Sequence, residues 1–122
     1  MADNKITGTA IVKVDGDELE TLDDGVTVDI GGVERPAKKG SGKVSGYQEK
    51  VTEPTLEVKV HHKKNTSLAY FNNITDATIE VVFDTGVQFI YQQAWTADSA
   101  KADASAGEVS LKFHAIRCDE VL

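Results

Sequence analysis

The chain is poor in the features that stabilise small extracellular domains or carry a protein into a membrane. Among its 122 residues there is one cysteine, Cys118, so no disulfide can form within the chain and a reducing compartment is the expected setting. No apolar run approaches the roughly 20 residues needed to span a bilayer. Residues 1–5 contain no apolar segment typical of a signal peptide. We therefore expect a cytosolic protein without a membrane partner.

Basic residues are also scarce relative to acidic ones. Lysine and arginine number 13 against 20 aspartates and glutamates, which gives a formal net charge of −7. Nucleic-acid-binding proteins usually carry a basic surface, and proteins that dock on anionic membranes carry clustered lysine and arginine. The charge balance argues against both functions.

What the chain does contain is an alternation of apolar and polar residues with the period of a β-strand. Ala10, Val12 and Val14, for example, alternate with Ile11 and Lys13. Each segment of this kind predicts a half-buried strand. The segments are residues 9–14, 26–30, 56–61, 77–83, 87–92 and 109–115.

Turn-forming residues and one short helix complete the expected domain, residues 1–122. Turns are predicted at Asp15-Gly16, Asp24-Gly25 and Asp84-Thr85-Gly86. A helix is predicted from about Ser67 to Asn73, capped by Asn65 or Thr66. The length and the 40% hydrophobic content fit one globular domain.

Two segments fit neither pattern. Residues 31–50 contain five glycines and one proline and are expected to form a long loop, which in a compact domain is usually functional. From Glu34 to Lys50 there are five basic and two acidic residues, a local charge of +3 that leaves −10 for the remainder. Residues 96–108 are rich in Ala, Ser and Asp and are expected to be a mobile connection.

Motifs for nucleotide or metal binding are incomplete. Residues 40–43, Gly-Ser-Gly-Lys, are followed by Val44 where a phosphate-binding loop needs Ser or Thr. His61 and His62 are adjacent on a predicted strand, so they point to opposite faces and cannot easily share a metal ion. In the acidic stretch 15–20, Glu20 stands where a calcium-binding EF-hand loop requires glycine. We expect no cofactor and no metal.

Catalysis is not expected either. Cys118 is the one thiol, and His114 would share its face if both lay on one strand, but no oriented base or oxyanion site accompanies them. Asp119 and Glu120 beside the thiol also disfavour a thiolate. The alternative to a structural role is a small β-sandwich binding module for carbohydrate or protein. Such a module would group aromatic residues on exposed faces, whereas the eight aromatics here fall mostly on inward strand positions.

The order of short segments along the chain is more informative than any single motif. The order is Ile6–Ala10, Ile11–Gly16, Gly31–Arg35, Gly46–Glu49, Ile74–Thr78, Ala94–Ala97 and Gly107–Val109. This succession resembles the Mu-like family of phage tail tube proteins over essentially the whole chain. Two stretches depart from the resemblance: Pro36–Lys39 is more basic than expected, and His61–Lys64 replaces a more acidic, threonine-containing stretch.

The resemblance implies a mainly β fold, an antiparallel β-sandwich or half-barrel with one short flanking α-helix. It implies that copies assemble into hexameric rings with a continuous inner β-barrel. Such rings would stack into the hollow tube of a contractile tail through which DNA is ejected. The implied partners are the tail sheath, the baseplate or tail tip, and terminator proteins. The implied location is the virion tail, after synthesis in the host bacterial cytoplasm.

Two sets of residues are candidates for roles in such an assembly. We expect residues 31–50 to contact neighbouring subunits; the candidate residues are Gly32, Glu34, Arg35, Lys38, Lys39, Lys43 and Tyr47. Asp29 and Glu57 lie on the polar sides of two strands that flank this segment, and we expect them to face the lumen. Lys59 on the same face tempers the acidic bias.

Overall fold

The computed structural model describes residues 4–122, apart from the side chains of Asp23 and Asp24. Most of the chain is strand, as the alternation predicts. Along the chain the elements are β1 (Ala10–Val14), β2 (Asp17–Glu18), β3 (Thr21–Asp29), β4 (Gly32–Glu34), β5 (Ala37–Gly40), β6 (Lys43–Tyr47), β7 (Lys50–Thr52), β8 (Thr55–His61), α1 (Leu68–Asn72), β9 (Ala77–Phe83), β10 (Gln88–Asp103), β11 (Glu108–His114) and β12 (Arg117–Val121).

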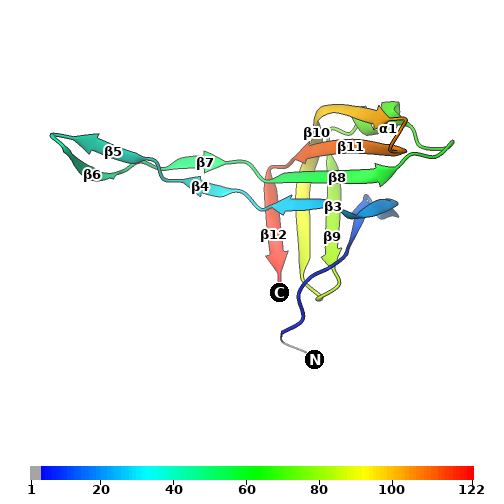
Figure 1. Ribbon diagram of the computed structural model, residues 1–122, viewed down its shortest axis with the longest axis horizontal. Coiled ribbons are helices and arrows are strands. Elements are labelled where there is room, and N and C mark those ends of the chain that lie inside the picture. Colours follow the sequence, from blue (N-terminus) through cyan, green and yellow to red (C-terminus); the bar gives the residue numbers. More distant parts are fainter. Residues whose placement is uncertain (1–3) are drawn as a thin grey trace.

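Eight of these strands build a body of two connected antiparallel sheets. Sheet A contains β2, β1, β9, the first half of β10, and β12, which pairs with β10. Sheet B contains the second half of β10, then β11, β8 and β3. The strands of sheet A run across those of sheet B (Figure 1). This curled half-barrel confirms the predicted fold class.

Strand β10 belongs to both sheets because it bends in the middle. Its pairing with β9 is irregular between Tyr91 and Ala94, and Gln93 between them has a positive φ of 53°. An irregularity of this kind bends a strand and lets it leave one sheet for another. The bend is therefore the corner of the half-barrel.

The core lies between the two sheets. The alternate residues of β1, β9 and the first half of β10 on one side, and those of β8 and β11 on the other, are buried. The fully buried side chains are Val12, Val14, Leu56, Val58, Ile79, Val81, Tyr91, Val109 and Phe113. Each buried aliphatic or aromatic side chain stabilises the fold by roughly 1.5–3 kcal/mol relative to exposure.

The short helix covers one end of this core. Ser67 caps it, its hydroxyl accepting a hydrogen bond from the backbone N–H of Tyr70 at 3.2 Å. The predicted caps, Asn65 and Thr66, are therefore wrong by one or two residues. Phe71 is buried, and the Asn72 side chain accepts a hydrogen bond from the Ala100 backbone at 2.8 Å, which ties α1 to β10. In the part of the chain that the structure describes, no helix is long and apolar enough to cross a membrane.

Three predictions about irregular structure are wrong. Residues 31–50 are not a loop without regular structure, because β4 pairs with β7 and β5 pairs with β6. Residues 96–108 are not a mobile connection up to Asp103, because β10 continues through them and pairs with β11. The backbone at Asp24-Gly25 does not turn but continues β3, with an irregular register between Thr21 and Val26. The turns at Asp15-Gly16 and Asp84–Gly86 are confirmed.

Candidate functional site

The outer face of sheet B is polar, and the register of its four strands fixes which side chains share it. Thr27, Glu57, Lys112 and Asp98 lie side by side on β3, β8, β11 and β10. Asp29 lies two residues from Thr27 on the same face. The structure thus brings the predicted pair, Asp29 and Glu57, onto one surface.

This polar face is acidic by a small margin. Among side chains that the structure describes, it carries five carboxylates and three lysines. They are Asp29, Glu57, Asp98, Asp103 and Glu108, with Lys59, Lys101 and Lys112. Lys59 lies 3.9 Å from Glu108, but the lysine is about half exposed, so this pair contributes little. The face is hollowed by a depression of about 420 Å³ bordered by Thr27, Glu57 and Ser110 among others.

The second surface is an arm, which we define as residues 32–52, that projects from one end of sheet B (Figure 1). Two short ladders build it: Val33 and Val51 are partners in the inner one, and Ala37 and Tyr47 in the outer one. No residue of the arm is buried. Two-stranded ribbons of this kind are at best marginally stable alone in water, so the arm gains little stability from its own two ladders.

The predicted contact residues all lie on this arm, and its chemistry is mixed. Val33, Val44, Tyr47 and Val51 expose apolar side chains. The outer ladder, 37–47, has lysines and no acidic residue. Nearer the body, Arg35 is 3.9 Å from Glu49, and both are more than half exposed. The arm therefore offers apolar contacts together with positive charge, whereas the remainder of the chain is acidic.

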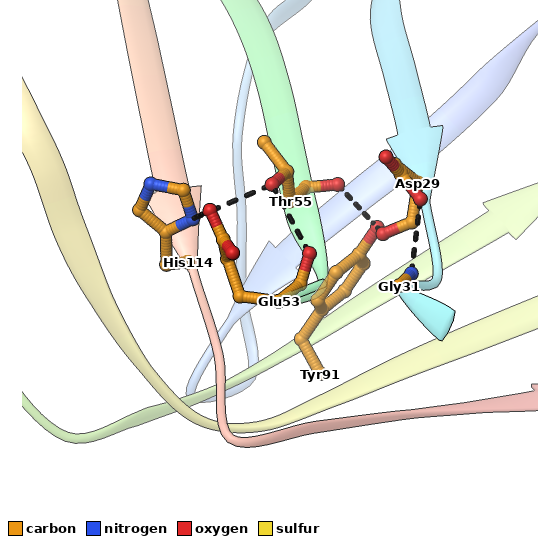
Figure 2. A network of polar contacts seen from close by, with 6 residues as sticks. All are labelled: Asp29, Gly31, Glu53, Thr55, Tyr91 and His114. Atoms are coloured by element: carbon orange, nitrogen blue, oxygen red, sulfur yellow. Dashed lines mark hydrogen bonds and ion pairs between the residues drawn. The ribbon is translucent and has the colours of Figure 1, made fainter. Parts of the chain in front are cut away.

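We call the place where β3 ends at Asp29 and β8 begins at Thr55 the root of the arm. A network that sequence reasoning did not anticipate holds this root (Figure 2). Tyr91, on β10 of sheet A, is fully buried, and its hydroxyl lies 2.9 Å from the carbonyl oxygen of Thr55 and 3.2 Å from that of Asp29. The Asp29 carboxylate accepts a hydrogen bond from Gly31 N–H at 2.9 Å. Alternation marked Tyr91 as an inward residue, but no signal in the sequence pairs it with Asp29 and Thr55.

Cys118 and His114 lie on different strands of different sheets. His114 ends β11 and lies on the polar face of sheet B beside Trp95, with a ring separation of 6.1 Å. Cys118 lies on β12 opposite Tyr91 and packs against the core of the sandwich. Burial raises the pKa of the Cys118 thiol to about 11; the neighbouring Tyr91 opposes part of this rise, and Asp119 and Glu120 each add a smaller increase. The thiol is therefore protonated at neutral pH.

We expect Cys118 to be dispensable and slow to react. At pH 8 a thiol pKa of about 11 rather than 9.0 lowers the thiolate fraction about 100-fold. Higher intrinsic nucleophilicity offsets part of this, which leaves alkylation roughly tenfold slower than for a free cysteine. Iodoacetamide labelling against a model peptide measures this. Cys118→Ser should assemble as the parent does, and loss of assembly would reveal a role that the geometry does not indicate.

Metal ligands do not gather on the described surface. Within residues 4–122, the side chains of Asp23 and Asp24 aside, no three His, Cys, Asp or Glu residues are placed to hold one ion. His61 ends β8 and is exposed, as is His62. The two most extended surface features are the polar face of sheet B and the arm.

Comparison with known proteins identifies relatives of the chain. A family model described as phage tail tube protein matches residues 3–120. The chain is 37% identical over 114 residues to the Mu-like prophage FluMu tail tube protein of Haemophilus influenzae, covering 93% of this chain and 94% of the relative. It is 32% identical over 111 residues to the tail tube protein of Escherichia phage Mu, covering 91% of each.

Solved structures share the fold at low sequence identity. The sheath/tube terminator of the extracellular contractile injection system PVC matches with a TM-score of 0.70 at 11% identity, covering 99% of each chain. Hcp1 from Flavobacterium johnsoniae matches with a TM-score of 0.63 at 15% identity, covering 92% of this chain and 94% of the other. At such identities the likeness concerns the fold alone.

Proposed function

Because this chain belongs to the phage tail tube protein family and is a structural subunit of a tail tube, we propose that its copies close into hexameric rings that stack into the hollow inner tube of a contractile tail. The subunit works by self-association and has no catalytic role. Its partners in the tail are the sheath, the baseplate or tail tip, and the terminator. DNA leaves the particle through the lumen without being bound specifically.

The polar face of sheet B carries this proposal. A sheet face that stays polar while its opposite face packs into a core is suited to line a water-filled bore. Strand β3 is the terminal strand of sheet B, and its free edge offers hydrogen-bonding groups to a neighbouring sheet. Joining sheets edge to edge in a closed ring satisfies such groups. The arm supplies a second, head-to-tail contact of the kind that extends rings into a tube.

Electron cryomicroscopy of the assembled protein tests the proposal. We expect stacked six-membered rings in which sheet B of every subunit faces the bore and the arm lies against a neighbouring copy. A protein that remains monomeric at high concentration, or a tube with sheet B on its outside, would contradict it. Size-exclusion chromatography of the same sample gives the mass of the smallest assembled species.

We predict that the lumen releases DNA because its lining has no basic excess. Each phosphate neutralised by lysine or arginine strengthens DNA binding through counterion release. Glu57→Lys removes one negative and adds one positive charge per subunit on the polar face, so tubes of this variant should retain short duplex DNA at low salt at least about tenfold more than parent tubes. Retention should fall steeply as salt is raised.

A matched control separates the lumen from charge in general. Glu80→Lys makes the same change in net charge, but Glu80 lies on the outer face of sheet A, opposite Lys13 on β1. Tubes of this variant should retain DNA no better than the parent. Tight DNA retention by parent tubes, or equal retention by both variants, would show that the face of sheet B does not line the bore.

A further inference from the structure

The arm is joined to the body by only two chain crossings. One runs from the end of β3 into β4, and the other from β7 into the start of β8. The β3–β8 ladder ends at the pair Asp29 and Thr55. Whatever holds this last pair therefore decides the direction in which the arm leaves the body.

Tyr91 holds that pair from the other sheet. Its hydroxyl has one proton to donate, and two carbonyl oxygens lie within hydrogen-bond distance, 2.9 Å away on Thr55 and 3.2 Å away on Asp29. The side chain is fully buried, and burial raises the pKa of Tyr91, with Cys118 nearby adding to the shift. The hydroxyl therefore stays protonated and remains a donor. One side chain of sheet A thus fastens both strands of sheet B where the arm begins (Figure 2).

Gly31 allows the two chain segments to approach closely at the same root. Its φ of +78° lies in the left-handed region that favours glycine. A Cβ built at this position would lie 2.8 Å from both the Pro54 nitrogen and the Thr52 oxygen. These are backbone atoms at the end of β7 and in the link from β7 to β8, so they could not move aside without shifting the arm.

The side-chain contacts between the root and His114 of β11 are too long to do the same work. His114 Nδ1 is 3.5 Å from the Glu53 carboxylate and 3.4 Å from the Thr55 hydroxyl. The Glu53 side chain is 60% exposed, so this ion pair contributes little. Hydrogen bonds beyond about 3.2 Å are weak. Among the side chains that reach the root from other strands, Tyr91 therefore makes the shortest hydrogen bonds, and its loss should loosen the root most.

We propose that Tyr91 is a positioning residue for assembly, whose buried hydroxyl holds the root pair Asp29 and Thr55 so that the arm projects in one direction. The inference rests on the proposed role of the arm in subunit contacts. The direction matters because the arm is long. It extends for about ten residues at roughly 3.3 Å each, so a rotation of about 10° at the root moves its tip by roughly 6 Å. A displacement of that size would take the tip away from a packed contact.

Spin-label distances in the monomer test this directly. Labels at Ser41→Cys on the arm tip and Gln88→Cys on sheet A, both in a Cys118→Ser background, report the direction of the arm. Tyr91→Phe keeps the ring and removes the hydroxyl, so the distance distribution should become clearly broader. Gly31→Ala should shift its centre, because the opposite strand must move.

Assembly is measured on the same variants without labels. For Tyr91→Phe we expect the concentration needed for tube formation to rise about tenfold. Val12→Ala is the matched control, since Val12 is a fully buried residue of β1 in sheet A that is not part of the root network. Val12→Ala should lower the melting temperature at least as much as Tyr91→Phe does. It should nevertheless leave the spin-label distance distribution narrow and assembly close to that of the parent.

The outcomes separate this inference from the proposed function. If the parent forms no tubes, the proposed function fails, while the monomer distances still decide whether Tyr91 directs the arm. A Tyr91→Phe distribution as narrow as that of the parent overturns the inference. So does equal broadening in Val12→Ala, because the arm would then respond to any loss of stability.

Discussion

Replacing residues 36–45 with a short Gly-Ser link is expected to yield a folded monomer that no longer forms tubes. The segment contributes no buried side chain to the core, so its removal should leave the two sheets intact. It does remove Lys38, Lys39, Lys43 and the exposed Val44, and with them the net positive charge and the tip of the arm. A ribbon of this kind is marginal alone, so we expect it to be covered by a neighbouring subunit in the tube.

The measurements are thermal unfolding for the fold and negative-stain imaging with sedimentation for assembly. A matched control replaces residues 104–106 with Gly-Ser, because this exposed turn between β10 and β11 is also outside the core. That variant should form tubes of normal length. Normal tubes from the arm variant would remove the arm from the subunit contacts.

Phe113→Ala should destabilise the fold more than any of the other substitutions proposed above. Phe113 is fully buried on β11, in the middle of the core between the two sheets. Truncating a buried phenylalanine costs about 3–5 kcal/mol, since transfer energy is lost and a cavity remains. That is a large part of the roughly 5–15 kcal/mol typical of a domain, so we expect a melting temperature lower by roughly 10–20 °C.

Lys112→Ala is the control, because the neighbouring residue lies on the polar face of the same strand. Surface substitutions of this kind usually change stability by no more than about 0.5 kcal/mol. Chemical denaturation of both variants gives the free energies of unfolding. A loss below about 1 kcal/mol for Phe113→Ala would mean that the site collapses around the smaller side chain or that the core is packed differently.

The sequence by itself determined the body of this protein. Strands with one buried face must alternate, so β1, β8, β9, the first half of β10 and β11 could be located from their apolar residues, and their inward faces could be assigned correctly. The family followed from the order of short segments. Asp29 and Glu57 were placed on polar sides by the same alternation, although each strand was considered alone.

Where strands lack a core face or a regular register, the pattern disappears and prediction failed. The arm has no buried residue to impose alternation, so its glycines and lysines indicated a loop. Residues 96–103 of β10 are interrupted by irregular pairing at Asp98 and Lys101, which breaks the period of two. Gly25 indicated a turn, but it lies within strand β3. A Cβ at this position would lie 2.9 Å from the Lys59 Cβ, so the glycine lets β8 approach β3 closely.

Only the tertiary structure decided how these pieces work together. The register of β3 against β8 places Asp29 and Glu57 on one face, and the bend at Gln93 brings Tyr91 of sheet A to the root of an arm that leaves sheet B. The physical reason is that alternation is a local property of one strand. The choice of partner strand, the register and the crossing of the two sheets depend on contacts between residues as far apart as Asp29 and Tyr91, which no local pattern encodes.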